Sequence, residues 1–153
     1  MKRVLVPVDY SDSSLDVLRF AAEIAKRMGG DLTALHVWEC MPHAPPDLKV
    51  RGRDGKPRKL EDVIREDAEN EMKQFIAGAA LPAELKTKTL VKSGDASKCV
   101  LSELDTGKYD LLVMGTHGRG GVQHVVLGSV AEKIIRAAKV PVITVPIGPR
   151  NGD

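Results

Sequence analysis

Residues 111–130 read LLVMGTHGRGGVQHVVLGSV, and this stretch is the most informative part of the sequence. Its first four residues form a short apolar run, which is typical of a strand buried on both faces. A glycine-rich loop begins at Gly115, and Gly128 and Ser129 open a helical pattern. A strand, a glycine loop and a helix N-terminus in this order are typical of phosphate-binding sites. Glycine N–H groups can approach an oxyanion without a Cβ in the way, and the helix dipole favours negative charge.

The composition indicates a single domain with an ordinary hydrophobic core. A chain of 153 residues is long enough to bury such a core without disulfides or a structural metal. The formal net charge of +2 gives no reason to expect a nucleic-acid partner. Cys40 and Cys99 lie far apart and predict free thiols in a reducing compartment. Because Asp9 interrupts the N-terminal apolar run, we expect neither a signal peptide nor a membrane span, and a soluble cytoplasmic protein.

The N-terminal forty residues predict a βαβ unit. Residues 3–8 form an apolar, β-branched run that indicates a buried strand, and residues 32–38 form a second one. Between them, apolar residues recur at helical spacing until Gly29 ends the pattern. Either Ser11 or Ser13 can cap this helix. The crossover of such a unit is right-handed in nearly all proteins.

The rest of the chain continues the alternation of strands and helices. Glu61 and Asp62 suit the positive end of a long amphipathic helix, and a lysine-bearing strand after it suits an exposed edge. Cys99 falls on the apolar face of the next helix, which predicts a core position. We expect these further elements at 60–79, 85–90, 94–107, 111–114, 129–138 and 142–145. The order predicts an α/β fold for residues 1–153: a single-domain, open, twisted parallel five-stranded sheet with helices on both faces.

The segment from Cys40 to Arg58 breaks this alternation. It contains four prolines, two glycines and five Lys or Arg residues, and its apolar residues follow no period. Such a composition predicts a solvated, flexible loop at about 40–58. A lid over the functional site is the alternative interpretation.

Three polar or glycine-rich segments follow predicted strands: residues 9–11, residues 37–39 and the loop from Gly115. In open parallel sheets, ligands bind outside the carboxyl ends of the strands, where the winding reverses, so we expect these segments to meet in one crevice. The chain contains no G-x-x-x-x-G-K-[ST] string, and the run from Gly118 fails to complete G-x-G-x-x-G because it reaches Gln123. These absences disfavour a P-loop NTPase and a Rossmann dehydrogenase.

The chain resembles the universal stress protein family, and specifically its ATP-binding branch, in four strings: PVDYS at 7–11, LHVWE at 35–39, MGTHGRGG at 114–121 and LGSV at 127–130. The resemblance covers Lys2 to about Pro146, apart from the segment 40–58. Its most specific element is a G-x2-G-x9-G-[ST] spacing, carried without departure by Gly115, Gly118, Gly128 and Ser129. The resemblance implies a Rossmann-like fold of the adenine nucleotide alpha hydrolase type.

The same resemblance implies a site for ATP or another adenine nucleotide, with Mg²⁺ bridging its phosphates. Pro7, Val8 and Asp9 match the segment beside adenine and ribose, and Val37 matches the position whose backbone reads the adenine edge. The ribose and phosphate cradle is matched by Met114, Gly115, Thr116, His117, Gly118, Arg119, Gly120, Gly128, Ser129 and Val130. The sequence identifies neither a protein ligand for the metal nor a catalytic residue.

Some of these residues also admit an ordinary structural role. Asp9 can cap a turn as well as accept from ribose hydroxyls. His117 can contact phosphate, act as a general base or be only a loop residue, and Arg119 can pair with phosphate or stay solvated. The remaining histidines do not have the spacing of metal ligands; they are His36, His43 and His124.

Three functions are compatible with these patterns. The first is an ATP-binding stress-response module acting as a homodimer, a state that the resemblance implies and that the apolar edge strand Val142–Val145 favours. The second is a slow ATP hydrolase or phosphotransferase that uses Asp9 or His117. The third is an interaction protein in which the loop glycines serve only turn geometry. Neither a nucleic acid nor a membrane is an expected partner.

Overall fold

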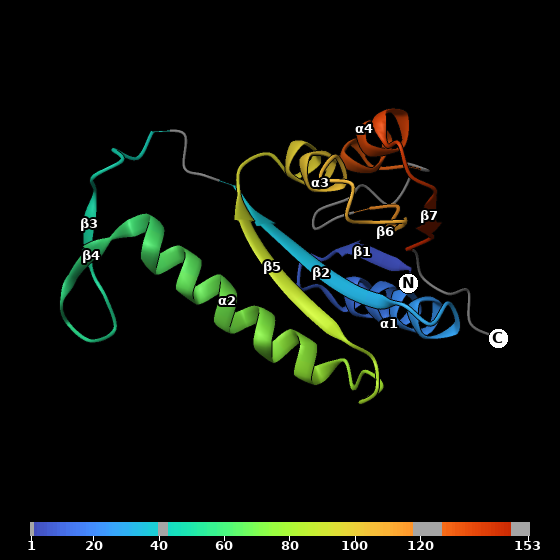
Figure 1. Ribbon diagram of the computed structural model, residues 1–153. Helices are drawn as coiled ribbons and strands as arrows, with labels where there is room; N and C mark the ends of the chain where they lie inside the picture. The colour runs from blue at the N-terminus through green and yellow to red at the C-terminus, as the bar shows by residue number, and fades with distance from the viewer. Residues whose placement is uncertain (1, 40–42, 118–126, 148–153) are drawn as a thin grey trace.

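The computed structural model describes residues 2–39, 43–117 and 127–147. Five parallel strands form one sheet in the order β5-β2-β1-β6-β7 (Figure 1). Their bounds are Arg3–Pro7 for β1, Asp31–Trp38 for β2, Thr87–Ser93 for β5, Leu111–Gly115 for β6 and Val142–Val145 for β7. The predicted α/β fold with a parallel five-stranded sheet is therefore confirmed.

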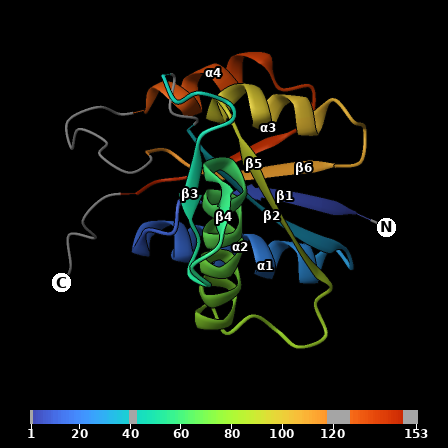
Figure 2. The ribbon, with the colours of Figure 1, turned by 90° about the vertical axis from the view of Figure 1, so that its left-hand side faces the viewer.

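Helices cover both faces of the sheet. α1 (Asp12–Arg27) and α2 (Leu60–Gly78) lie on one face, and α3 (Ala96–Leu104) and α4 (Ser129–Ala137) lie on the other (Figure 2). Successive strand side chains point to opposite faces, so β1 feeds both cores: Val4 and Val6 pack on the α1 side and Leu5 on the α3 side, all fully buried. In the described part of the chain, no helix is long and apolar enough to cross a membrane.

Local sequence signals set the two ends of α1. Of the two candidate caps, Ser11 is the one used: its hydroxyl accepts a hydrogen bond from the Ser14 N–H at 3.1 Å. After the helix, Gly29 takes a φ of 61°, a left-handed conformation that glycine adopts without a Cβ clash. The chain then turns directly into β2.

The winding of the sheet reverses at β1. From β1 the chain passes through α1 to β2 on one side, whereas β6 and β7 lie on the other side. Crossovers that leave in opposite directions open a crevice outside the carboxyl ends of the two central strands. The fold therefore places the ends of β1 and β6 beside a crevice.

The segment 40–58, predicted as a loop, contains secondary structure that its composition does not indicate. Within its described part, β3 (Lys49–Arg51) and β4 (Pro57–Lys59) pair as an antiparallel hairpin. The hairpin lies away from the sheet, next to the N-terminus of α2 (Figure 1). Three-residue strands rich in Lys, Arg and Pro carry no hydrophobic alternation, and the sequence pattern therefore missed them.

Two smaller expectations are also corrected. The edge strand β5 begins at Thr87 and continues to Ser93, because it pairs with β2 along the whole of residues 32–38. Cys99 is half-buried instead of lying in the core, and its thiol donates to the Ser93 carbonyl at 3.5 Å. Its neighbour Val100, 1% exposed, fills the core position.

Tyr10 connects the loop after β1 to α2. Its ring stacks on His36 with centroids 4.0 Å apart and meets Phe75 edge-on at 5.4 Å. Its hydroxyl donates to the Ala68 carbonyl at 2.8 Å. Burial, and then the negative charge of Glu71, raises the pKa of Tyr10, so the hydroxyl stays protonated and able to donate. The loop that enters the crevice is thereby tied to α2.

We expect Tyr10→Phe to lower the free energy of unfolding by about 1 kcal/mol, because it removes one partly buried hydrogen bond and keeps the ring packing. Tyr10→Ala should cost about 2 kcal/mol, because the ring contacts are lost as well. Urea unfolding followed by circular dichroism measures both values. If Tyr10→Phe were as stable as the unchanged protein, the hydroxyl would not hold α2.

Candidate functional site

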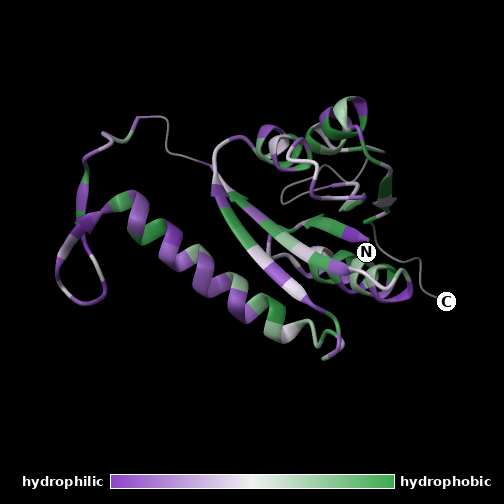
Figure 3. Ribbon diagram, in the orientation of Figure 1, coloured by the Kyte–Doolittle hydropathy of each residue, from purple (hydrophilic) through white to green (hydrophobic). Residues whose placement is uncertain are grey.

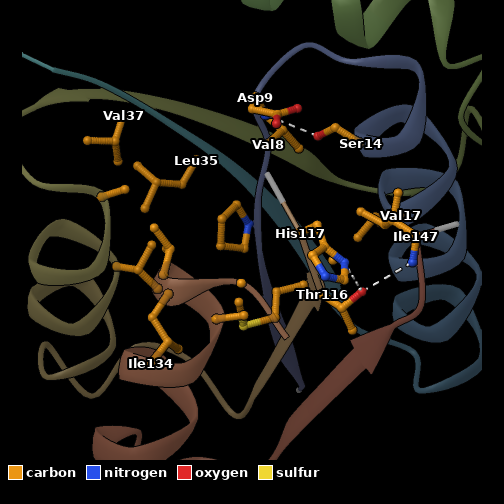
Figure 4. Close-up of a pocket in the computed structure, with 18 of the residues that line it drawn as sticks. Val8, Asp9, Ser14, Val17, Leu35, Val37, Thr116, His117, Ile134 and Ile147 are labelled. Atoms are coloured by element: carbon orange, nitrogen blue, oxygen red, sulfur yellow. Dashed lines mark hydrogen bonds between the residues drawn. The ribbon is translucent and has the colours of Figure 1, made fainter. Parts of the chain in front are cut away.

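A cavity of about 400 Å³ lies outside the carboxyl ends of β1 and β6 (Figure 4). This volume falls within the usual range for small-molecule sites. The cavity is lined by the end of β1, the first turns of α1, the end of β2, α3, the end of β6 and the N-terminus of α4. The three segments expected to converge, after β1, at the end of β2 and at Gly115, therefore share one cavity.

Asp9 borders the cavity from a hydrogen-bonded turn at the start of α1. Its Oδ1 accepts from the Ser11 N–H at 3.0 Å and from the Ser11 hydroxyl at 2.5 Å. The Asp9 N–H donates to Ser14 Oγ at 3.0 Å. Asp9 therefore caps a turn, which is one of the two roles that the sequence allows for it. Because its side of the turn also lines the cavity, that role is compatible with contact to a ligand.

Gly128 brings the N-terminus of α4 against the turn after β6. Its N–H donates to the Thr116 carbonyl at 2.7 Å, and a Cβ at Gly128 would lie only 3.1 Å from that oxygen. Ser129 then begins α4, and both Ser129 and Val130 line the cavity. The first N–H groups of an α-helix have no partner within the helix, so this end of the cavity suits an anion.

Thr116 ties the glycine turn to the chain around the end of β7. The Thr116 N–H donates to the Val145 carbonyl at 3.1 Å, and the Ile147 N–H donates to Thr116 Oγ1 at 3.2 Å. Thr116 Oγ1 also lies 3.0 Å from Nδ1 of His117. The Ile147 side chain occupies the space that a Cβ at Gly115 would need. The last strand is therefore part of the frame of the cavity.

One side of the cavity is apolar. Figure 4 shows Leu35, Val37 and Ile134 on this side, away from Thr116 and Ile147. An apolar slot beside polar backbone groups suits a planar aromatic ring with a charged tail. Glu39, which lines the cavity as well, belongs to the predicted segment 37–39, and the lining residues that sequence reasoning missed are Ser14, Val17, Leu35, Ala96, Val100, Ala131, Ile134 and Ile147. Helical spacing marked several of them as inward-facing but could not show that they face a cavity.

All of the predicted site residues that the structure describes line this cavity: Pro7, Val8, Asp9, Val37, Met114, Gly115, Thr116, His117, Gly128, Ser129 and Val130. Gly118, Arg119 and Gly120 lie outside the described residues. The described part of the segment 40–58 contributes no lining residue, so the structure gives no support to its interpretation as a lid.

The charged side chains of the described cavity wall are acidic. Asp9 and Glu39 line it, and no Lys or Arg does so within residues 2–39, 43–117 and 127–147. Over the same ranges, no three His, Cys, Asp or Glu side chains are grouped so that they could hold a metal ion. Among the described residues, the groups that can attract an anionic ligand are therefore backbone N–H groups and the positive end of the α4 dipole.

Comparison with known proteins identifies the family. Residues 1–146 match the sequence profile described as "Universal stress protein family". The chain belongs to the universal stress protein family. One curated relative is universal stress protein MJ0531 of Methanocaldococcus jannaschii, 28% identical over 144 residues that cover 94% of this chain and 81% of the relative. The family predicted from the four sequence strings is therefore confirmed.

Solved structures of universal stress proteins have the same fold. UspA from Lactobacillus plantarum is 25% identical, with a TM-score of 0.74, over 94% of this chain and 97% of that one. The universal stress protein from Archaeoglobus fulgidus, solved in complex with dAMP, is also 25% identical. Its TM-score is 0.58, and the match covers 94% of this chain and 97% of that one.

Proposed function

We propose that this universal stress protein binds an adenine nucleotide, ATP with Mg²⁺, in the cavity between β1 and β6, as a nucleotide-dependent stress-response module. The observation that carries the proposal is the close junction of Thr116 and Gly128, which sets the N-terminus of α4 at the edge of a cavity with an apolar slot. The Archaeoglobus fulgidus relative, whose structure holds dAMP, supports the same class of ligand.

In this proposal the apolar side of the cavity takes the base. The backbone of Val37 reads the adenine edge, Pro7 and Val8 lie beside the ring, and the Asp9 carboxylate accepts from ribose hydroxyls. The phosphates lie against the N–H groups of the turn and of α4, within the set Met114, Gly115, Thr116, His117, Gly118, Arg119, Gly120, Gly128, Ser129 and Val130. Bound Mg²⁺ would neutralise phosphate charge, which suits a wall that carries the carboxylates of Asp9 and Glu39.

Calorimetric titration with MgATP tests the proposal. We expect saturable binding, and weaker binding of MgGTP, because guanine presents a different edge to the Val37 backbone. No heat of binding with nucleotide at about 1 mM, where even a ligand held by only 4 kcal/mol would register, would contradict the proposal. That result would favour the alternative of an interaction protein whose glycines serve turn geometry.

We also propose that the protein acts as a homodimer paired through β7. This strand lies at one edge of the sheet, next to β6 alone. Its residues Val142, Ile143 and Val145 are only half-buried, and an uncovered apolar edge favours pairing with a second copy. The N–H of Thr116, in the proposed phosphate cradle, donates to the carbonyl of Val145, in the proposed dimer strand, so one hydrogen bond links the two sites directly.

A slow ATP hydrolase or phosphotransferase is the second candidate, because Asp9 and His117 both line the cavity. We expect His117→Ala and Asp9→Ala to leave the rate of phosphate release close to that of the unchanged protein. Loss of a working general base would instead lower that rate by about 100-fold or more. Phosphate release at saturating ATP measures it, with calorimetry as the control for binding. A rate abolished by His117→Ala with binding intact would establish the hydrolase.

A further inference from the structure

The hairpin and the first turns of α2, residues 43–67, project from the rest of the molecule, and we call them the arm. Figure 1 shows the hairpin well beyond the sheet, on the side of β5. No residue of the arm is buried. The buried residues of α2, Ala68 and Met72, come only after it. The arm therefore has no core of its own.

An arm with no core of its own is expected to need a packing partner for stability. A two-stranded hairpin on its own is marginally stable in water, and every residue of β4 is exposed. An apolar groove of about 120 Å³ lies at the base of the arm, lined by Trp38, Ala44, Pro45, Pro46, Leu48, Leu60, Glu61 and Ile64. Leu48 on the rim of this groove is 39% exposed. The arm thus presents open strand edges beside an uncovered apolar groove.

The hairpin and helix α2 carry opposite charge. The hairpin, residues 49–59, has six Lys or Arg residues and one Asp, a net charge of +5. Helix α2 has six acidic residues and two basic ones, a net charge of −4. In Figure 3 the hairpin is mostly hydrophilic, and hydrophilic residues recur along α2. The two oppositely charged surfaces lie next to each other in one chain.

Only part of this charge is paired within the chain. Arg53 pairs with Asp67 at 3.3 Å, and Arg58 pairs with Asp54 at 3.0 Å and with Glu66 at 2.7 Å. Among the described residues, no ion pair is made by Lys49, Arg51, Lys56, Lys59, Glu61 or Glu69. Cations on the hairpin and carboxylates on the helix therefore face solvent together.

We propose that the arm docks on the arm of a second copy of this chain, with the basic hairpin of each copy on the acidic helix of the other. In a two-fold symmetric pair every contact occurs twice, so each copy must carry both complementary surfaces, as the arm does. The groove supplies apolar area to bury, and the charges set the orientation. The groove shares no lining residue with the nucleotide cavity, and α2 packs on β5 at the edge of the sheet opposite β7.

A charge-swap experiment tests this proposal by sedimentation velocity. The hairpin variant is Lys49→Glu with Arg51→Glu, and the helix variant is Glu61→Lys with Glu69→Lys. Each variant alone should lose one association step, so that its assembly has half the mass of the unchanged protein. An equimolar mixture of the two should recover that mass, because each reversed surface then meets its complement. The control, Lys88→Glu with Lys108→Glu, makes the same charge change as the hairpin variant, outside the hairpin and α2, and should keep the full mass.

Trp38 provides a second readout. It is the only tryptophan of the chain and it lines the groove. Association should shift its emission to shorter wavelength as protein concentration rises, and salt raised from about 0.05 M to about 0.5 M should weaken the shift. Unchanged mass in both charge variants would overturn the proposal. Hairpin-dependent binding of polyglutamate without self-association would also overturn it, in favour of an acidic partner.

Discussion

Ser129→Glu is expected to lower the affinity for MgATP about 100-fold, which corresponds to about 2.7 kcal/mol. Ser129 is the first residue of α4 and lines the cavity, so the new carboxylate would lie where the proposed phosphates bind. Like charges placed together in a binding site cost several kcal/mol. The same carboxylate is favourable for the helix itself, by about 0.3–1 kcal/mol, because it lies at the positive end of the dipole. We therefore expect binding to be lost without loss of stability.

Calorimetry and thermal unfolding of the same variant separate these two effects. Ser129→Gln, which has the size of glutamate without its charge, is the matched control and should retain most of the affinity. Ser129→Ala should lose about 2- to 10-fold, because it removes a hydroxyl and keeps the backbone N–H. If Ser129→Glu bound MgATP as tightly as Ser129→Gln, the N-terminus of α4 would not hold phosphate.

The second large effect is expected at Glu103, where substitution should lower the free energy of unfolding. This carboxylate is 6% exposed, accepts from the Tyr109 hydroxyl at 2.9 Å and pairs with Lys92. It thereby joins α3 to β5 and to the segment that enters β6. Burial alone would raise the pKa of Glu103, but the hydrogen bonds from Lys92 and Tyr109 and the charge of Lys92 outweigh it and hold the pKa below its ordinary value. Burial, and then the bond to Glu103, raises the pKa of Tyr109 to about 12.

We expect Glu103→Ala to lower the free energy of unfolding by about 3 kcal/mol, because it leaves the Tyr109 hydroxyl without this acceptor and opens a cavity. Glu103→Gln should cost about 1–2 kcal/mol, because it keeps the shape and loses the charge. Denaturant unfolding at neutral pH measures both. Glu132→Gln is the matched control: its partner Arg136 and Glu132 are both well exposed, so we expect a change below about 0.5 kcal/mol.

The lowered pKa of Glu103 also predicts a pH dependence. Because the folded pKa is lower than the unfolded value of about 4.3, the unfolded chain binds the proton more readily. The stability that this group contributes is present above about pH 4.3 and is lost as the pH falls through the folded pKa. Glu103→Gln should therefore flatten the fall of unfolding free energy below about pH 4.3. An unchanged slope would show that Glu103 is not held in its charged form.

The elements that could be predicted are those whose apolar residues follow a clear pattern in the sequence. Strand β7 was predicted with its bounds, Val142–Val145, because it is a short apolar run between two prolines. Strands β3 and β4 escape prediction because neither has a fully buried residue and each is only three residues long, too short for an apolar alternation to be recognised. The predicted end of β5 at Leu90 is wrong because the length of its partner β2, and not the local pattern, carries the pairing on to Ser93.

The residues that line the candidate site likewise include some that the sequence predicts and some that it does not. Asp9 and Gly115 could be placed beside the cavity because both lie at the carboxyl ends of predicted parallel strands, where ligands bind in open sheets. Val100 and Ile134 could not, because an apolar residue facing a cavity and one facing the core have the same spacing on a helix. Gly128 shows what the structure adds: the sequence marks the glycine, and only the structure shows that a Cβ there would lie a tight 3.1 Å from the Thr116 carbonyl.

The central claim is that remote segments of the chain meet in one cavity and hold a nucleotide through backbone amides. Amide NMR of the isotope-labelled protein, titrated with MgATP, tests it most directly. We predict shifts concentrated at the end of β2 around Val37, at the turn from Gly115 to His117 and at Ser129 and Val130. Shifts confined to the arm, or absent from the turn and from α4 at saturating nucleotide, would contradict the account.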